Sequence, residues 1–320
     1  MTFSVVDLFA GAGGLSLGFK TAGFKVMSAV EANKYMTEAY HANLPDVKIQ
    51  QKEVVDLVPE SFMGVDVVVG APPYEAFMAT NKERRKEPRD RLYEDHHGET
   101  VLHFVDFIAA SRPKAWLLEL HPDAAEDDIM QSLGEEFAKA GSGQVYVTFL
   151  NAADFGATTD RVSLFLSNVP LEPEPPEEMG PPVGALMEET EEDENETSNH
   201  EIDTLPPEKL TKIQSLEPGD CLEPISLNGH DEVYPNWFRL IPEATAPPMY
   251  GFTRFVHPFE DRLCTVREFA RLMGFPENFV FTGQRNLQFD AVGNAVPPPL
   301  ARRVASEVGL ALTQMQKNIA

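Results

Sequence analysis

Long apolar runs and cysteines are both scarce in this 320-residue sequence. No stretch reaches the roughly 18–20 consecutive apolar residues of a transmembrane helix. The opening MTFSVVDLFAGAGG lacks the basic segment of a signal peptide and indicates a strand. Cys221 and Cys264 are too few for a disulfide framework or a structural zinc site. We therefore expect a soluble protein of the cytoplasm or nucleus, with no membrane partner and no bound metal.

Basic residues are also few: the chain has 26 Lys and Arg and 51 Asp and Glu, which gives a net charge of −25. Phosphate binding needs Lys and Arg, so this balance disfavours a nucleic-acid partner. The deficit is uneven: 14 acids and no base lie between Glu172 and Glu208, in a proline-rich stretch that is too polar to fold on its own. The opposite bias occurs in one ten-residue run. Its six bases are Lys82, Arg84, Arg85, Lys86, Arg89 and Arg91.

The first 170 residues alternate β-rich runs with helical stretches, which is the pattern of βαβ units in an α/β fold with a doubly wound, mostly parallel sheet. We expect strands at 3–9, 25–31, 65–70, 115–120, 144–150 and 162–166. We expect helices at 15–22, 34–43, 99–111, 124–140, 265–273 and 299–317. The predicted organisation is a core at 1–170, an acidic disordered insert at 171–208, a small irregular second domain at 209–255, and a segment at 256–320 that returns to the core.

A glycine-rich loop follows the first predicted strand and precedes the first predicted helix. It reads Asp7-Leu-Phe9-Ala-Gly11-Ala-Gly13-Gly14. Glycines allow a sharp turn and a close backbone approach to a ligand, and the helix N-terminus offers free N–H groups. Glu31 ends the second predicted strand, where an acid about 20 residues further on can hold ribose hydroxyls. Together these features predict a nucleotide-like cofactor.

Further motifs follow in a fixed order along the chain. They are Pro72-Pro73-Tyr74-Glu75, Glu119, Asn151-Ala-Ala-Asp154-Phe-Gly156, Thr265-Val-Arg-Glu268 and Gly293-Asn294-Ala-Val296. In this order, and with the glycine loop, they resemble the DNA cytosine-5 methyltransferase family, over nearly the whole chain except about 170–250. The resemblance implies a Rossmann-like fold that uses S-adenosylmethionine, with the 209–255 region as a vestigial target-recognition domain.

The resemblance also assigns roles to single residues. It implies that Phe9, Gly11 and Gly13 wrap S-adenosylmethionine and that Glu31 holds its ribose. Glu53 stands where the family has an acid that contacts the adenine, with Asp56 as the other possible register. Pro72 would lie beside the sulfonium, and Asn294 and Val296 would close the pocket. The basic run 82–91 resembles the family's mobile catalytic loop, which closes on DNA.

The departures from the family pattern fall on the side that faces the base. Tyr74 replaces the Cys whose thiolate attacks C6 of cytosine, and Glu75 replaces a Gln. A thiol of pKa ~8.5 is partly thiolate at pH 7, whereas a phenol of pKa ~10 is roughly 0.1% phenolate. The family's Glu-Asn-Val reads Glu119-Leu120-His121, and its Gln-x-Arg-x-Arg reads Thr159-Asp-Arg161-Val-Ser163. The resemblance therefore implies that, of the family's catalytic residues, Glu119 and Arg161 are retained. Tyr74 marks the position of the missing nucleophile.

We interpret the chain as a cytosine-5 methyltransferase homologue that binds S-adenosylmethionine, lacks catalysis and has a regulatory or binding role. Its expected partners are DNA or RNA, bound weakly, or an active methyltransferase or another protein. One alternative is an active methyltransferase that transfers to a nucleic acid or another acceptor without the usual Cys. Another is an active cytosine-5 enzyme whose motifs we have misaligned. Neither Cys264, expected to be buried ahead of a helix, nor Cys221, in the variable region, suits a replacement nucleophile.

Overall fold

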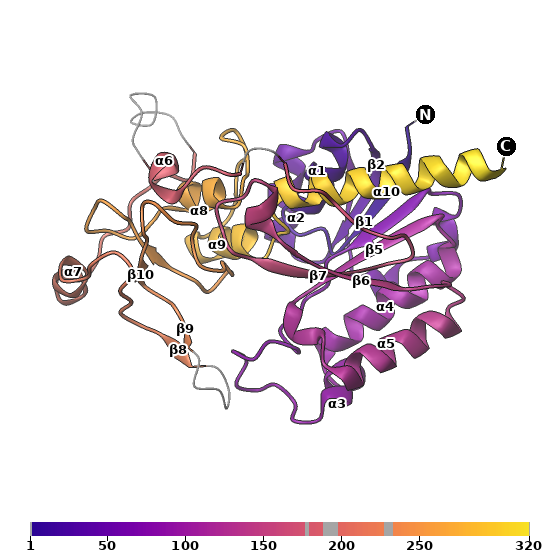
Figure 1. The fold of residues 1–320 in the computed structure, drawn as a ribbon, viewed down its shortest axis with the longest axis horizontal. Coiled ribbons are helices and arrows are strands. Elements are labelled where there is room, and N and C mark those ends of the chain that lie inside the picture. The colour runs from indigo at the N-terminus through magenta and orange to yellow at the C-terminus, as the bar shows by residue number, and fades with distance from the viewer. Residues whose placement is uncertain (1, 177–178, 188–197, 227–232, 320) are drawn as a thin grey trace.

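A seven-stranded sheet forms the centre of the protein. The structure is a computed structural model that describes residues 2–176, 179–187, 198–226 and 233–319. The strand order is β3-β2-β1-β4-β5-β7-β6 (Figure 1). The strands are β1 (Ser4–Leu8), β2 (Lys25–Glu31), β3 (Lys48–Gln51), β4 (Val67–Gly70), β5 (Ala115–Leu120), β6 (Tyr146–Asn151) and β7 (Val162–Ser167). β7 runs antiparallel to both neighbours, whereas the other pairs are parallel. The predicted α/β fold with a mostly parallel sheet is confirmed.

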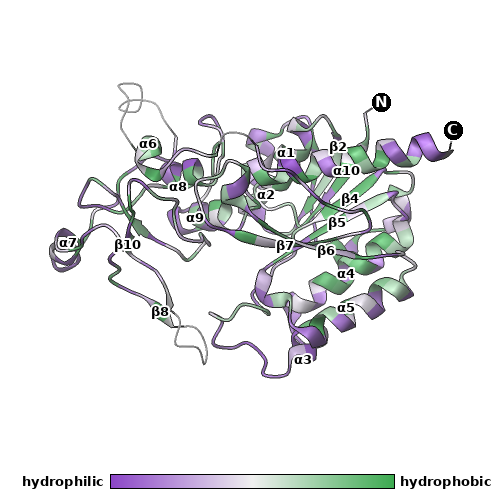
Figure 2. Cartoon of the chain, viewed as in Figure 1, coloured by the Kyte–Doolittle hydropathy of each residue, from purple (hydrophilic) through white to green (hydrophobic). Residues whose placement is uncertain are grey.

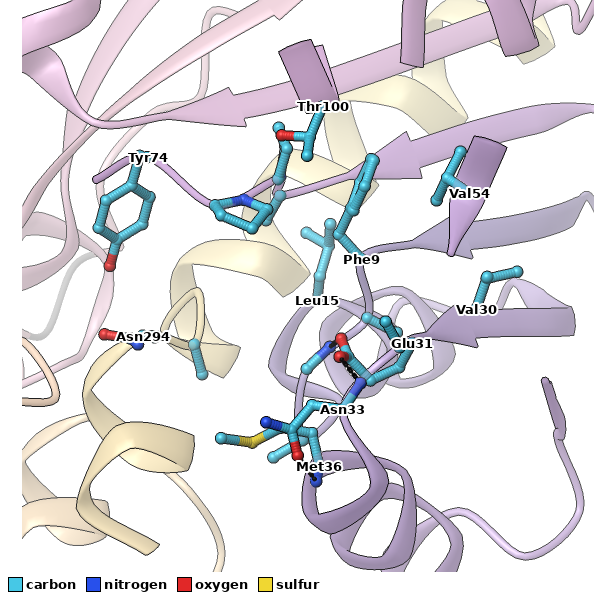
Figure 3. Close-up of a pocket in the computed structure, with 18 of the residues that line it drawn as sticks. Phe9, Leu15, Val30, Glu31, Asn33, Met36, Val54, Tyr74, Thr100 and Asn294 are labelled. Carbon is cyan, nitrogen blue, oxygen red and sulfur yellow. Dashed lines mark hydrogen bonds between the residues drawn. The ribbon is translucent and has the colours of Figure 1, made fainter. Parts of the chain in front are cut away.

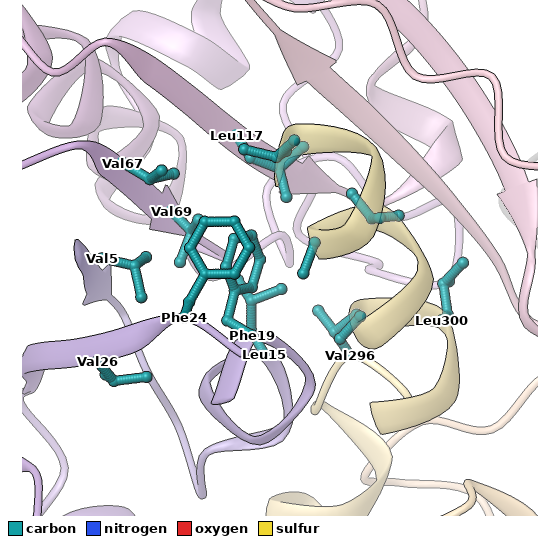
Figure 4. Packing of buried hydrophobic residues seen from close by; sticks show 14 of the residues in the cluster. Val5, Leu15, Phe19, Phe24, Val26, Val67, Val69, Leu117, Val296 and Leu300 are labelled. Atoms are coloured by element: carbon teal, nitrogen blue, oxygen red, sulfur yellow. The ribbon is translucent and has the colours of Figure 1, made fainter. Parts of the chain in front are cut away.

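Helices cover both faces of this sheet. α1 (Gly14–Thr21), α2 (Lys34–Asn43) and α10 (Pro298–Ile319) pack on one face, and α4 (His96–Ser111) and α5 (Asp127–Lys139) pack on the other. Successive strand residues alternate between the two layers, as in β4, where Val67 and Val69 contact the first layer and Val68 the second. Figure 4 shows the first layer, in which Phe19 and Leu300 meet the strands.

The predicted bounds of β2, β5 and α2 agree with the structure, whereas β3, α3 and the short 3-10 turns of the core were not predicted. β3 is the short edge strand Lys-Ile-Gln-Gln, whose polar residues give little strand signal until it pairs with β2. α3 (Pro88–Tyr93) lies within the predicted basic loop. Short 3-10 turns complete the core, namely η1 (Val54–Asp56), η2 (Pro59–Phe62), η3 (Pro122–Ala124) and η4 (Ala152–Phe155).

A second, smaller lobe lies beside the sheet (Figure 1). It contains α6 (Val183–Met187), α7 (Pro207–Gln214), β8 (Ile225–Ser226), β9 (Val233–Tyr234), β10 (Phe238–Arg239), β11 (Phe255–Val256), α8 (Val266–Leu272) and α9 (Arg285–Gly293). Met249 and Phe255 pack with Phe269 and Val292 in one apolar cluster. The predicted boundary between 255 and 256 therefore does not separate two packing units. Val296 and helix α10 pack in the cluster of the sheet, whereas Val266, Phe269 and Val292 of the predicted segment 256–320 pack in the small lobe.

The predicted disorder of 171–208 does not hold for its described part. Val183 is fully buried in the cluster of the small lobe, and Met187 is buried beside it. The buried Asn199 side chain donates to the carbonyl of Phe281 at 2.8 Å and accepts from its N–H at 2.9 Å. A few side chains, Val183, Met187 and Asn199, thus hold the described part of 171–208 against the small lobe, although the stretch as a whole has few apolar residues. The run 188–197 lies outside the described residues.

Figure 2 shows the hydropathy of each residue. The sheet strands β4 and β5 are apolar, whereas the helices α3 and α7 at the periphery are hydrophilic. Among the described residues, no helix is both long enough and apolar enough to cross a membrane.

Candidate active site

A cavity of about 310 Å³ lies where β1, β2 and β4 end. This is the edge at which α/β sheets bind ligands, because the loops after parallel strands diverge there. Figure 3 shows Phe9, Glu31, Met36 and Asn294 around it, from four different segments. Of the predicted cofactor residues, those that line it are Phe9, Gly11, Glu31, Glu53, Pro72, Asn294 and Val296.

The glycine loop shapes one wall of this cavity. Phe9 and Gly11 both adopt positive φ, of 57° and 53°. A Cβ on Gly11 would have no protein atom within 4 Å, so the backbone faces open space in which a ligand can approach it. Gly13 (φ 105°) was predicted to contact the cofactor, but it does not line the cavity. A Cβ there would lie 3.0 Å from the Tyr40 ring, so Gly13 serves packing at the start of α1.

Glu31 holds the loop from the end of β2. Its Oε2 accepts the N–H of Gly11 at 2.9 Å, and its Oε1 accepts the N–H of Asn33 at 2.7 Å. Burial raises the pKa of the Glu31 carboxyl, and the backbone hydrogen bonds oppose this shift. Each carboxylate oxygen has a second lone pair, which suits a hydroxyl donor of a ligand. Glu31 therefore has the chemistry predicted for it.

The two candidate adenine acids differ in position. Glu53 lines the cavity ahead of η1, whereas Asp56 is exposed and does not line it, so the geometry favours the Glu53 register. Asn33, Met36, Thr100 and Asp290 also line the cavity, but were not predicted.

Tyr74 follows β4 and stands at the far end of the cavity (Figure 3). It is only 6% exposed, and its hydroxyl lies 3.4 Å from a guanidinium nitrogen of Arg161. Burial raises the pKa of Tyr74, and Arg161 only partly opposes this effect. The phenolate is therefore even rarer than in a free tyrosine.

Glu119 and Arg161 lie behind Tyr74 and are each 2% exposed. Glu119 accepts from the Ser163 hydroxyl at 2.7 Å, and its other oxygen has no hydrogen-bond partner among the described residues. Arg161 donates to the backbone carbonyls of Met249 and Gly293. Neither Glu119 nor Arg161 lines this cavity or the one that adjoins it.

An aromatic layer separates this buried pair from the cavities. The Tyr74 ring packs against the rings of His121 and Tyr250, with centroids 5.6 and 6.3 Å away. His121 Nε2 lies 2.6 Å from the Tyr250 hydroxyl, and burial lowers the pKa of His121 to about 4. His121 is therefore neutral at pH 7. Because Asp123 donates its N–H to His121 Nδ1, Nε2 carries the proton and donates to Tyr250.

A second cavity of about 810 Å³ adjoins the first. The two share Asn33, Met36, Tyr74, Glu75, His97, Asp290 and Asn294. A ligand in the second cavity would thus lie directly beside a ligand in the first cavity. Tyr74 lines both cavities, whereas the buried Glu119 lines neither.

Comparison with known proteins identifies the family. The profile of C-5 cytosine-specific DNA methylases matches residues 3–310. The chain belongs to this methylase family. It is 35% identical over 316 residues to the putative type II methyltransferase M.MJ0563P of Methanocaldococcus jannaschii, which covers 95% of this chain and 98% of the relative. It is 30% identical over 337 residues to the type II methyltransferase M1.HphI of Haemophilus parahaemolyticus, at 96% and 87% coverage.

Solved structures of other methyltransferases share the fold. A putative DNA modification methyltransferase encoded within an E. coli prophage superposes with a TM-score of 0.75 at 22% identity, covering 98% of this chain and all of the other. Entamoeba histolytica methyltransferase EhMeth superposes with a TM-score of 0.72 at 13% identity, covering 98% of this chain and 99% of the other. The predicted Rossmann-like methyltransferase fold is confirmed.

S-adenosylmethionine is the methyl donor of the methylase family, and the first cavity fits it. Glu31 would hold the ribose, Glu53 the adenine, and the open backbone at Gly11 would receive the chain of the cofactor. When bound, the cofactor supplies an electrophilic methyl group. Pro72 and Tyr74, which line the cavity, would help to orient it and shield it from water.

Several side chains of the basic run 82–91 are paired with acids of the same chain. Arg91, predicted to contact nucleic acid, is 4% exposed and donates to Glu126 and to two backbone carbonyls. Arg84 lies 3.5 Å from Glu126, and Arg85 lies 3.3 Å from Glu94. Arg91 is thus a structural residue of α3. The exposed bases of the run are Lys82, Arg85, Lys86 and Arg89.

Cys264 is 2% exposed within the apolar cluster of the small lobe, as predicted, and burial raises the pKa of its thiol. The backbone of Cys221 forms an isolated β-bridge with Phe238, and Cys221 lines neither cavity. Within the described ranges, no group of three or more His, Cys, Asp or Glu side chains is placed to hold a metal.

Proposed function

We propose that this methylase homologue binds S-adenosylmethionine without methylating C5 of cytosine, and that it acts as a regulatory or binding member of the family. One observation carries the proposal: Tyr74, where the family resemblance expects the Cys, lines both cavities, whereas the buried Glu119 and Arg161 line neither. Cytosine C5 becomes nucleophilic only after a group adds to C6, and a buried phenol is a poor group for that step.

The remaining parts of the base site support the same conclusion. A flipped base must reach hydrogen-bonding groups to be held in place. Glu119 instead bonds Ser163, and Arg161 bonds backbone carbonyls. The expected weak nucleic-acid binding agrees with the run 82–91, in which Arg84, Arg85 and Arg91 are bound to acids of the same chain. A protein partner, such as an active methyltransferase, belongs to this proposal.

Two measurements on the purified chain test the proposal. S-adenosylhomocysteine should raise the melting temperature, because a ligand of the folded state stabilises it. Labelled S-adenosylmethionine should leave no 5-methylcytosine in mixed DNA and RNA, with a family member that has the Cys as the positive control. Turnover to 5-methylcytosine would overturn the proposal. No thermal shift at millimolar cofactor would refute only its cofactor half.

The second cavity favours one other candidate function, a methyl transfer to an acceptor that needs no covalent activation. Its residues Tyr74, Glu75 and Asn294 also line the cofactor cavity, so an acceptor there would lie close to the methyl donor. The same labelled cofactor, incubated with cell extract, would then deliver label to a fraction other than nucleic acid.

A further inference from the structure

The second cavity has a chemical character of its own. Its charged lining has four carboxylates, from Glu75, Glu83, Asp95 and Asp290, and one guanidinium, from Arg85. Arg85 is committed to Glu94, with 3.3 Å between the charged groups. This excess of negative charge repels phosphate and attracts cations.

Two of these carboxylates, from Glu75 and Asp290, line both cavities. Glu75 Oε2 is shielded from solvent and has no hydrogen-bond partner among the described residues. Asp290 belongs to α9 and lines the same cavity. Burial is the main cause that raises the pKa of Asp290, Arg254 opposes the shift, and the charge of Glu75 adds to it. Two carboxylates that repel each other across a cavity are stabilised by a cation between them.

Aromatic rings supply the apolar part of the wall. Tyr74, Tyr250 and Phe252 line the cavity, and the rings of Tyr250 and Phe252 stack at 5.7 Å with 21° between their planes. Aromatic faces attract cations through their quadrupole, most strongly those that carry few waters of hydration, such as alkylated ammonium groups. Metal cations and phosphates would not use these rings.

We propose that the second cavity binds an organic cation, an alkylated ammonium group, beside the cofactor. Glu75 and Asp290 would balance its charge, and the exposed ring of Phe252 would contact its alkyl groups, since the buried Tyr250 ring already has the Arg161 guanidinium 5.3 Å from its centroid. The inference rests on the proposed function, because a nucleic acid bound as in cytosine methylation would need the same space.

Choline is a suitable probe, because 3,3-dimethyl-1-butanol has nearly the same shape without the charge. Calorimetric titration of both compounds into the protein, with the first cavity saturated by S-adenosylhomocysteine, isolates the second cavity. We expect saturable choline binding and at least about tenfold weaker binding of the neutral compound. Equal affinities for the two compounds, or no choline binding at about 50 mM, would overturn the proposal.

Matched variants locate the bound cation. Glu75→Gln and Asp290→Asn should each lower choline affinity about tenfold, because each removes a charge next to the ligand. Phe252→Leu should weaken choline more than the neutral compound, since it removes the ring but keeps an apolar side chain. Glu60→Gln, an exposed change that lines neither cavity, is the control and should change nothing. Unchanged choline affinity in both carboxylate variants would place the cation elsewhere and refute the site.

The outcomes separate this inference from the proposed function. If S-adenosylhomocysteine does not bind, the cofactor part of the proposed function fails, and choline titration of the free protein still tests the second cavity. If the chain methylates cytosine, the proposed function fails, and the choline result shows independently whether the acidic cavity accepts a cation.

Discussion

Asp7, at the end of β1, is a buried acid whose ionisation should cost stability. It is 1% exposed, its Oδ2 accepts the Ser16 hydroxyl at 2.6 Å, and its Oδ1 has no partner among the described residues. The Ser16 oxygen in turn accepts from the Tyr40 hydroxyl at 2.7 Å. Burial raises the pKa of Asp7 from 3.8 to about 7, and the hydrogen bonds from Ser16 only partly offset this.

The sign of the effect follows from proton binding. The folded state keeps the proton up to about pH 7, whereas the unfolded state releases it near 3.8. The contribution of Asp7 to the free energy of unfolding is therefore greatest below pH 3.8, falls as the pH rises to about 7, and is flat above that. At ~1.4 kcal/mol per pH unit the total fall is about 4 kcal/mol, of which about 3 kcal/mol lies between about pH 5 and 8.

Asp7→Asn should remove this pH dependence. The amide oxygen can still accept from Ser16, but the amide nitrogen takes the place where Oδ1 has no partner, which costs about 1–3 kcal/mol at every pH. The variant should therefore be less stable than wild type near pH 5 and gain about 3 kcal/mol relative to it by about pH 8. The exposed Asp56→Asn is the control.

Urea unfolding, followed by the fluorescence of the buried Trp116 at several pH values, measures the effect. Parallel stability curves for wild type and Asp7→Asn between about pH 5 and 8 would refute the reasoning, because they would show that Asp7 is ionised throughout this range.

Four further substitutions test the site and the small lobe. Gly11→Val should weaken S-adenosylhomocysteine binding at least about tenfold, since its side chain enters the open space of the cavity, and should also lower the melting temperature, because a β-branched residue is strained at the φ of 53° found there. Gly14→Val should lower the melting temperature further, because a Cβ there would clash with the Val296 carbonyl oxygen. Tyr74→Cys should yield no 5-methylcytosine by mass spectrometry of treated DNA, because Leu120, Thr159 and Ser163 still stand where the family resemblance expects other base-site residues, and activity in this single variant would show an intact base site. Glu268→Ala should destabilise the protein by about 2–3 kcal/mol in urea unfolding, because it removes two hydrogen bonds to the buried Arg262, at 2.8 and 2.9 Å, and the capping bond from the Thr265 N–H, while Glu260 still pairs with Arg262. A loss below about 1 kcal/mol would mean that water reaches this pair.

Local signals explain most of what was predictable. The run of β-branched residues in Val67–Gly70 and the Thr265 to Glu268 capping box each act within one strand or one turn, and both elements form as expected. β3 was missed because its stability comes from pairing with β2 rather than from its own residues. Docking of 179–187 was missed for a similar reason, since Val183 is held by the cluster that contains α8.

The sequence by itself determined the family, because the family motifs are short and follow one another in a fixed order. It also grouped Phe9, Glu31, Pro72 and Asn294 as one predicted ligand site, and the structure brings these residues to one cavity. The replacement of the family's nucleophile by Tyr74 stays a prediction from the motifs. Only the tertiary structure decided that Tyr250 and His121 join Tyr74 in front of Glu119, that Arg91 is used internally, and that Glu75 and Asp290 share an acidic cavity. These contacts join segments far apart in the chain, and they depend on how the small lobe packs against the sheet, which no local pattern encodes.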